Sequence, residues 1–94
     1  MTAHLAKWKM VHMLAQTYAL EILEAVSKNP LRFTDLENYS PNERTRSQRL
    51  KELEHAGLIT TTSLKINMRS FVHYTATNKG RRVLQKTKEL ADMI

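Results

Sequence analysis

Residues 40–59 read SPNERTRSQRLKELEHAGLI and carry the clearest helix start and helix end in the chain. Ser40 fits the first position of a capping box with the proline and glutamate that follow it. Asn42 is an alternative cap two residues later, because its side chain can also accept a free backbone N–H. Gly57 can supply the left-handed residue that often ends a helix. The stretch predicts a helix over residues 41–56.

The sequence after this helix predicts a β-hairpin and a final helix. Residues 58–62 and 71–77 are rich in β-branched and aromatic side chains, as strands are. We expect two antiparallel strands joined by a turn around residues 65–70. Thr77 can then cap a last helix that continues to Leu90 or beyond.

The sequence before residue 40 predicts two helices and two short elements. Good helix formers fill residues 3–27, and Thr17 marks an interruption that divides the run into two helices. Asn29 ends the second helix because a residue before proline avoids the helical region. Residues 31–33 fit a very short strand, and residues 34–39 fit a small helix capped by its threonine.

The order of elements is helix, helix, helix, hairpin, helix, which is typical of a winged helix-turn-helix. We therefore expect a mainly α (α+β) fold with a two-stranded β-hairpin wing. No proline-rich or glycine-rich linker divides the 94 residues, so residues 1–94 are expected to form one domain. Within it we assign residues 1–18 to an N-terminal dimerisation helix, 19–77 to the winged-helix core and 78–94 to a C-terminal helix.

The positive charge lies in the second half of the chain. The net charge is +6, and residues 1–40 hold four bases and four acids, whereas residues 41–94 hold eleven bases and five acids. A basic half on a small domain favours a polyanionic partner, most simply nucleic acid. A solvated basic face without a partner is the alternative that charge alone leaves open.

The predicted helix over residues 41–56 has side chains suited to reading DNA. Arginine can bond guanine at two edge atoms, and glutamine can do the same with adenine. In a winged helix this second helix enters the major groove, and the hairpin reaches the backbone or the minor groove. The expected DNA-contacting residues on the helix are Arg44, Thr45, Arg46, Ser47, Gln48, Arg49 and Lys51. Those on the wing are Lys65, Asn67, Arg69 and Ser70, with Lys65, Asn67 and Arg69 expected to share one face.

Three segments resemble HxlR-type winged-helix regulators. They are residues 32–36 (RFTDL), 47–59 (SQRLKELEHAGLI) and 74–80 (YTATNKG). The last two also resemble segments of MarR-like and PadR-like proteins. Arg46 and Ala76 depart from the pattern, because an apolar residue and a leucine are usual there. The chain has no cysteine, so the thiol sensing of many such regulators is not expected.

The resemblance implies a homodimeric transcriptional regulator that binds a pseudo-palindromic operator in double-stranded DNA. The first segment is apolar over most of its circumference, and the last predicted helix has its own apolar stripe, so both can pack against a second chain. The expected dimer-interface residues are Leu5, Trp8, Val11, Leu14, Val83, Leu84, Leu90 and Ile94. A monomer whose terminal helices fold back on its own core is the alternative.

The sequence contains no motif for catalysis, metal or cofactor. It has no glycine-rich phosphate loop and no paired histidines at metal-ligand spacing, and no effector ligand is predicted. No apolar run is long enough to span a membrane, and we expect a cytoplasmic protein. Two alternative functions remain at this point: a winged-helix module that binds another protein, and a non-specific nucleic-acid-binding architectural protein.

Overall fold

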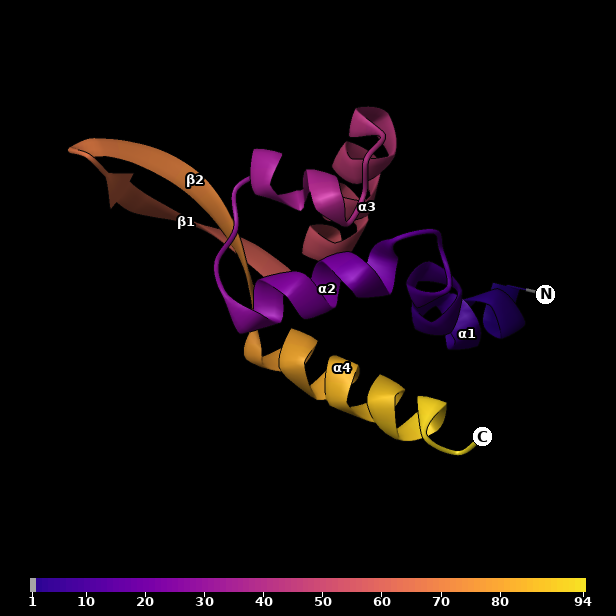
Figure 1. Cartoon of the computed structure of the whole chain (residues 1–94). Helices are drawn as coiled ribbons and strands as arrows, with labels where there is room; N and C mark the ends of the chain where they lie inside the picture. Colours follow the sequence, from indigo (N-terminus) through magenta and orange to yellow (C-terminus); the bar gives the residue numbers. More distant parts are fainter. Residues whose placement is uncertain (1) are drawn as a thin grey trace.

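The computed structural model describes the backbone of residues 2–94 and the side chains of residues 6–94. Figure 1 shows the order of elements, which is the predicted winged helix-turn-helix. The elements are α1 (Thr2–Leu14), α2 (Ala19–Lys28), a short 3-10 helix η1 (Thr34–Asn38), α3 (Glu43–His55), β1 (Ile59–Ile66), β2 (Arg69–Ala76) and α4 (Asn78–Ala91).

The core is built around α2, which lies between α3 and α4 (Figure 1). Its buried residues recur every three or four positions, which places them on one side of the helix. Leu50 and Leu53 of α3 and Leu84 of α4 pack against them, together with Leu58 and Ile59. The start of β1 and the end of β2 thus meet the helices, and the remainder of the hairpin extends beyond this core.

Both ends of α2 follow the sequence prediction. Tyr18 has a left-handed backbone (φ 68°), which separates α1 from α2 next to the predicted interruption at Thr17. Asn29 is extended (φ −150°) before Pro30 and ends the helix. The interruption lets α1 leave the direction of α2 and cross one end of the molecule (Figure 1).

Two predicted helix caps are wrong. At α3 the cap is Asn42, whose side-chain oxygen accepts the Thr45 N–H at 2.9 Å. Ser40 is fully buried and its hydroxyl has no hydrogen-bond partner among the described residues, so it lies too deep in the turn to cap. Thr34 begins a 3-10 helix without capping it, and the turn is instead closed by Asp35, which accepts the backbone N–H of Arg32 at 2.9 Å.

The hairpin is longer and its turn tighter than predicted. β1 and β2 pair in register from Ile59 opposite Ala76 to Ile66 opposite Arg69, leaving only Asn67 and Met68 in the turn. Both turn residues have positive φ (51° and 69°), as in a type I′ turn. Leu31 adds a short bridge to the other edge of β2, which confirms a strand-like segment there.

The junction between hairpin and α4 is closely packed. Thr77 caps α4 as predicted, because its hydroxyl accepts the Gly80 N–H at 3.0 Å. A Cβ atom at Gly80 would lie 1.9 Å from the carbonyl oxygen of Leu58, so only glycine fits there without movement. Gly57 has φ +77° and ends α3 as predicted.

The molecule is elongated because the hairpin and α1 extend from opposite ends (Figure 1). Its radius of gyration is 14.1 Å, whereas about 12 Å is usual for a compact domain of this length. Within the described residues, none of the helices has the length and apolar character that crossing a membrane requires.

Candidate nucleic-acid interface

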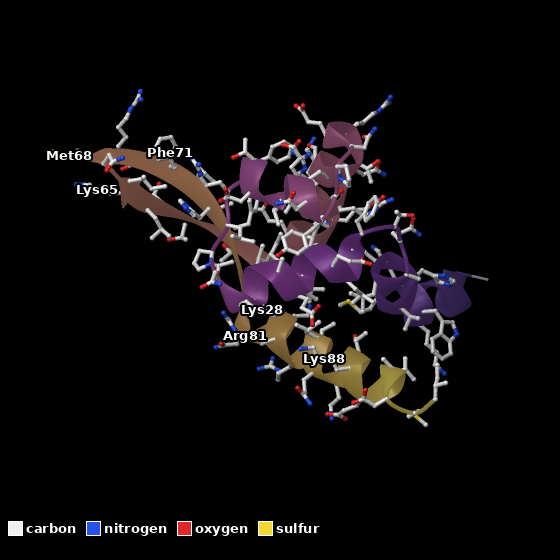
Figure 2. The ribbon with its side chains drawn as sticks, in the orientation of Figure 1. Lys28, Lys65, Met68, Phe71, Arg81 and Lys88 are labelled. Carbon is white, nitrogen blue, oxygen red and sulfur yellow. The ribbon has the colours of Figure 1, made fainter. Side chains whose placement is uncertain are left out.

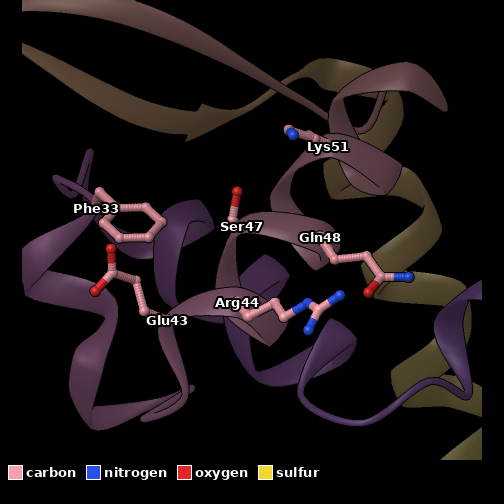
Figure 3. A pocket seen from close by; sticks show the side chains of 6 residues that line it. All are labelled: Phe33, Glu43, Arg44, Ser47, Gln48 and Lys51. Carbon is pink, nitrogen blue, oxygen red and sulfur yellow. The ribbon is translucent and has the colours of Figure 1, made fainter.

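One side of α3 presents the predicted reading side chains to solvent. Arg44 and Gln48 are one turn apart, as are Ser47 and Lys51, so the four lie on adjacent positions of the helix surface. They line a shallow hollow together with Phe33 and Glu43 (Figure 3). Phe33 and Glu43, which border this surface, were not among the predicted site residues.

The cations on this surface are available to an external partner. Among the described side chains, no carboxylate lies within ion-pair distance of Arg44 or Lys51, and both residues are exposed. Gln48 has a long contact of 3.5 Å from its amide nitrogen to Glu52. An unpaired guanidinium beside an exposed amide can donate to base edges or phosphate oxygens.

Arg46 is not part of this surface, and the prediction that it contacts DNA is wrong. Its side chain is only 5% exposed. Its guanidinium donates to the carbonyl oxygens of Ser40 (2.8 Å), Pro41 (3.1 Å) and Phe33 (3.4 Å) and stacks over the Phe33 ring. Two of these carbonyls, those of Ser40 and Pro41, lie in the turn between η1 and α3, and the third, that of Phe33, lies just before η1. The charged guanidinium thus ties α3 to both ends of η1.

Arg49 also turns toward its own chain. Its Nε donates to the carbonyl oxygen of Thr17 at 2.8 Å, and Nη1 pairs with Glu52 at 3.0 Å. The Arg49 side chain is 11% exposed, so it is largely occupied in joining α3 to the connection between α1 and α2. Two of the expected DNA-contacting arginines therefore position the helix, and Thr45 lies half-buried in its first turn.

The wing residues are exposed at the far end of the hairpin. Lys65, Asn67, Arg69 and Ser70 are all exposed. Lys65 lies opposite Ser70 and Arg69 opposite Ile66, and paired residues share a face. Lys65 and Arg69 are therefore on opposite faces of the hairpin, contrary to the prediction that they share one. The two-residue turn causes this. It places Ile66 opposite Arg69, so Arg69 shares a face with Ile66 and not with Lys65.

The terminal helices leave apolar side chains exposed at one end of the molecule. Trp8 and Val11 of α1 are about half exposed, and Leu90 of α4 is 65% exposed. Ile94 is fully exposed just after α4. An open groove with a largely apolar lining runs between α1 and α4.

The other expected interface residues are less available. Leu14 and Val83 pack partly against the core. Leu84 is 8% exposed, so the prediction that it contacts a second chain is wrong: α4 uses it to cover α2. The side chain of Leu5 lies outside the described residues.

One titratable group has a shifted pKa. Burial raises the pKa of the Tyr74 hydroxyl above its ordinary value of 10.0, and the nearby Glu54 carboxylate raises it further. Tyr74 lies in β2 where Leu31 bridges the strand. In the part of the chain whose side chains are described, no three His, Asp or Glu residues gather as metal ligands would.

A helix presented by a buried turn and followed by a projecting hairpin defines a winged helix-turn-helix DNA-binding protein. Residues 6–94 match the family described as HxlR-like helix-turn-helix, so the chain belongs to that family of transcriptional regulators. The departures at Arg46 and Ala76 do not remove it from the family. No curated protein matches the chain significantly.

Solved structures of similar proteins agree with this assignment. The protein ytfH from Salmonella typhimurium is 26% identical, with a TM-score of 0.73 over 92% of this chain and 78% of that one. The transcriptional regulator YodB from B. subtilis, in its reduced form, is 25% identical, with a TM-score of 0.73 over 92% and 88%. A MarR-family protein from Porphyromonas gingivalis W83 is 26% identical, with a TM-score of 0.71 over 89% and 83%.

Proposed function

We propose that this regulator binds a pseudo-palindromic operator in double-stranded DNA, sequence-specifically and as a homodimer. In this proposal α3 lies in the major groove and the hairpin lies on the backbone and minor groove of the same half-site. The observation that carries it is the pair of exposed cations on α3, Arg44 and Lys51, which have no ion-pair partner among the described side chains and lie beside Ser47 and Gln48. A solvated helix would be expected to pair such cations with its own acids, as Arg49 does with Glu52.

The side chains divide into those that read bases and those that bind phosphate. Arg44 and Gln48 are near the start of α3, the end that enters the groove in this fold, and both can make bidentate contacts to a purine. Lys51 is a point charge one turn further on and suits a phosphate oxygen. Lys65 and Arg69 would add phosphate or minor-groove contacts from the wing.

The homodimer is supported by the exposed apolar side chains of the terminal helices. Val11 and Leu90 border the groove between α1 and α4, and a second copy that covers it would remove their apolar surface from water. A two-fold protein also matches two half-sites spaced by one helical turn, about 34 Å apart. The apolar surface and the reading surface belong to different elements, so both can be engaged at once.

The test of DNA recognition is fluorescence anisotropy with labelled duplexes over a salt series. A duplex from the region upstream of the protein's own gene is compared with a random-sequence duplex of the same length. We expect the upstream duplex to remain bound at salt concentrations that release the random one, because base contacts are less salt-sensitive than phosphate contacts. Equal affinities with equal salt slopes would indicate a non-specific architectural binder. Absence of binding to both would refute DNA binding and favour a protein-interaction module.

The test of the homodimer is light scattering with an interface variant and a matched control. L90E places a charge on the exposed apolar position of α4, whereas Q85E adds the same charge to an exposed polar position of that helix. We expect the wild type and Q85E to be dimers and L90E to dissociate, because an unpaired carboxylate is costly to bury. A monomeric wild type, or a dimeric L90E, would contradict this interface.

A further inference from the structure

Met68 is placed at the outermost point of the hairpin with almost its whole side chain in water. It is 94% exposed, and among the large apolar side chains that the structure describes only that of the C-terminal Ile94 is more exposed. Figure 2 shows Met68 beside Lys65 at the tip, far from the helices. A single exposed apolar residue needs no explanation by itself, so its backbone and its neighbours must be considered.

The backbone at Met68 is in a conformation that methionine disfavours. Its φ of 69° lies in the left-handed region, and it is the second residue of a two-residue turn. Glycine is strongly preferred at that position because a Cβ atom crowds the following carbonyl group. Asn67, the first turn residue, is a type that tolerates this region well. The turn therefore keeps a large apolar side chain at a position where glycine would be more stable, and such strain is concentrated at functional sites.

The surroundings of Met68 indicate a polyanionic partner. Lys65 and Arg69 flank the tip from opposite faces of the hairpin, as their pairing shows. Residues 55–88 contain no aspartate or glutamate, so the entire hairpin is free of acidic groups. An apolar tip between two cations on opposite faces matches the DNA minor groove, which has a phosphate strand on each side and stacked base pairs at its floor.

We propose that Met68 inserts as an apolar wedge between two base pairs from the minor groove and kinks the bound duplex. This inference rests on the proposed DNA binding and adds a distinct consequence, because such wedges unstack one step and bend DNA by about 20–90° toward the major groove. Flexible pyrimidine–purine steps are the cheapest to unstack. The wing would thereby select for deformable sequence at a position where it makes no base-edge hydrogen bond.

The experiment uses a duplex selected from a random library by the wild-type protein. Bending is measured by energy transfer between dyes at its two ends, and unstacking by the fluorescence of 2-aminopurine placed at successive steps. Affinity is measured on the same duplex by anisotropy. The variants are M68G, which removes the wedge, M68L, which keeps an apolar side chain of similar size, and V72A, which shortens another exposed apolar residue of the hairpin.

We expect the wild type, M68L and V72A to bend the duplex by at least about 20° and to raise 2-aminopurine fluorescence at one step. M68G should lose most of both signals while it still binds, and its Tm should rise because glycine relieves the left-handed turn. Bound wild type with a straight duplex, or M68G with unchanged bending, would overturn the wedge and leave the proposed DNA binding intact. Failure of the wild type to select or bind any duplex would overturn both, and the exposed tip would then fit a protein partner.

Discussion

Helix α3 and the hairpin both present basic side chains, but the protein holds them in different ways. α3 is attached along its length by Leu50 and Leu53 in the core, by Arg46 in the preceding turn and by Arg49 to the connection after α1. The hairpin is attached mainly near its base, where Ile59 and Ala76 are buried and Leu31 bridges Tyr74, and the residues at its tip are exposed.

The difference shows what each element contributes. A helix that must place side chains against base edges needs a fixed position, because a small displacement breaks bidentate contacts. A hairpin that contacts phosphates and a groove of variable width tolerates more movement. Substitutions that loosen α3 should therefore change stability, whereas substitutions at the hairpin tip should change DNA geometry.

The largest effect is expected at the base of the hairpin, from G80A. The new Cβ would lie 1.9 Å from the carbonyl oxygen of Leu58, and backbone must move to admit it. We expect a loss of about 3 kcal/mol in the free energy of unfolding, at the upper end of overpacking effects, measured by urea denaturation. R82A, two residues later and exposed, is the control and should be near neutral. A stable G80A would show that the hairpin base is less constrained than α3.

The next effect separates two arginines of α3 that are two residues apart. R46M keeps an apolar side chain over Phe33 but removes the donors to the carbonyl groups of Ser40, Pro41 and Phe33. We expect a loss of about 3 kcal/mol, because the hydrogen bonds from a charged donor to these carbonyls, including that of the buried Ser40, are lost. R44M makes the same change on the exposed side and should leave the unfolding free energy within about 0.5 kcal/mol. Equal destabilisation by the two would contradict the separate roles.

The next effect concerns DNA binding by the exposed side of α3. R44A and Q48A should weaken binding to a selected duplex by about 1–3 kcal/mol and reduce discrimination against random sequence. K51A should weaken binding to both duplexes alike and reduce the salt slope by about 1. Anisotropy titrations at several salt concentrations measure both quantities. A uniform loss for all three variants would indicate that α3 binds phosphate without reading sequence.

The smallest effect is a pH dependence at the hairpin base. The raised pKa of Tyr74 means that the folded state holds the phenol proton more tightly than the unfolded state. Its stabilising contribution is complete below pH 10 and is lost as the pH rises through the folded-state pKa. We expect the unfolding free energy of Y74F to fall less steeply above pH 10 than that of the wild type. Parallel curves from pH 9 to 11 would refute a role for this group.

Most of the fold could be predicted from local sequence signals. The interruption at Thr17, the helix end at Asn29 and the left-handed Gly57 depend on conformational preferences of single residues and their neighbours. The amphipathic spacing of α2 likewise determined its buried face. The short turn was missed because Met68 occupies a position where glycine is the usual signal.

The elements of the candidate site were predicted, but the exposure of its residues was predicted only in part. The sequence predicted a helix after residue 40 and a hairpin after Gly57, and both elements are present. Helical spacing could not decide the direction of Arg46, since an arginine is usually exposed. Helical spacing also predicted that Leu84 contacts a second chain, whereas α4 buries Leu84 against α2.

The sequence by itself determined the order of elements, the family and the position of the basic half of the chain. These properties depend on local preferences, on motifs and on composition, which need no knowledge of distant contacts. Only the tertiary structure decided which arginines face outward and which face of the hairpin carries each cation. Arg46 turns inward because the carbonyls of Ser40, Pro41 and Phe33 converge on it, and Lys65 and Arg69 separate because a two-residue turn sets the register. Both outcomes depend on which segments lie next to each other in the folded chain, and the spacing of residues in the sequence does not give this.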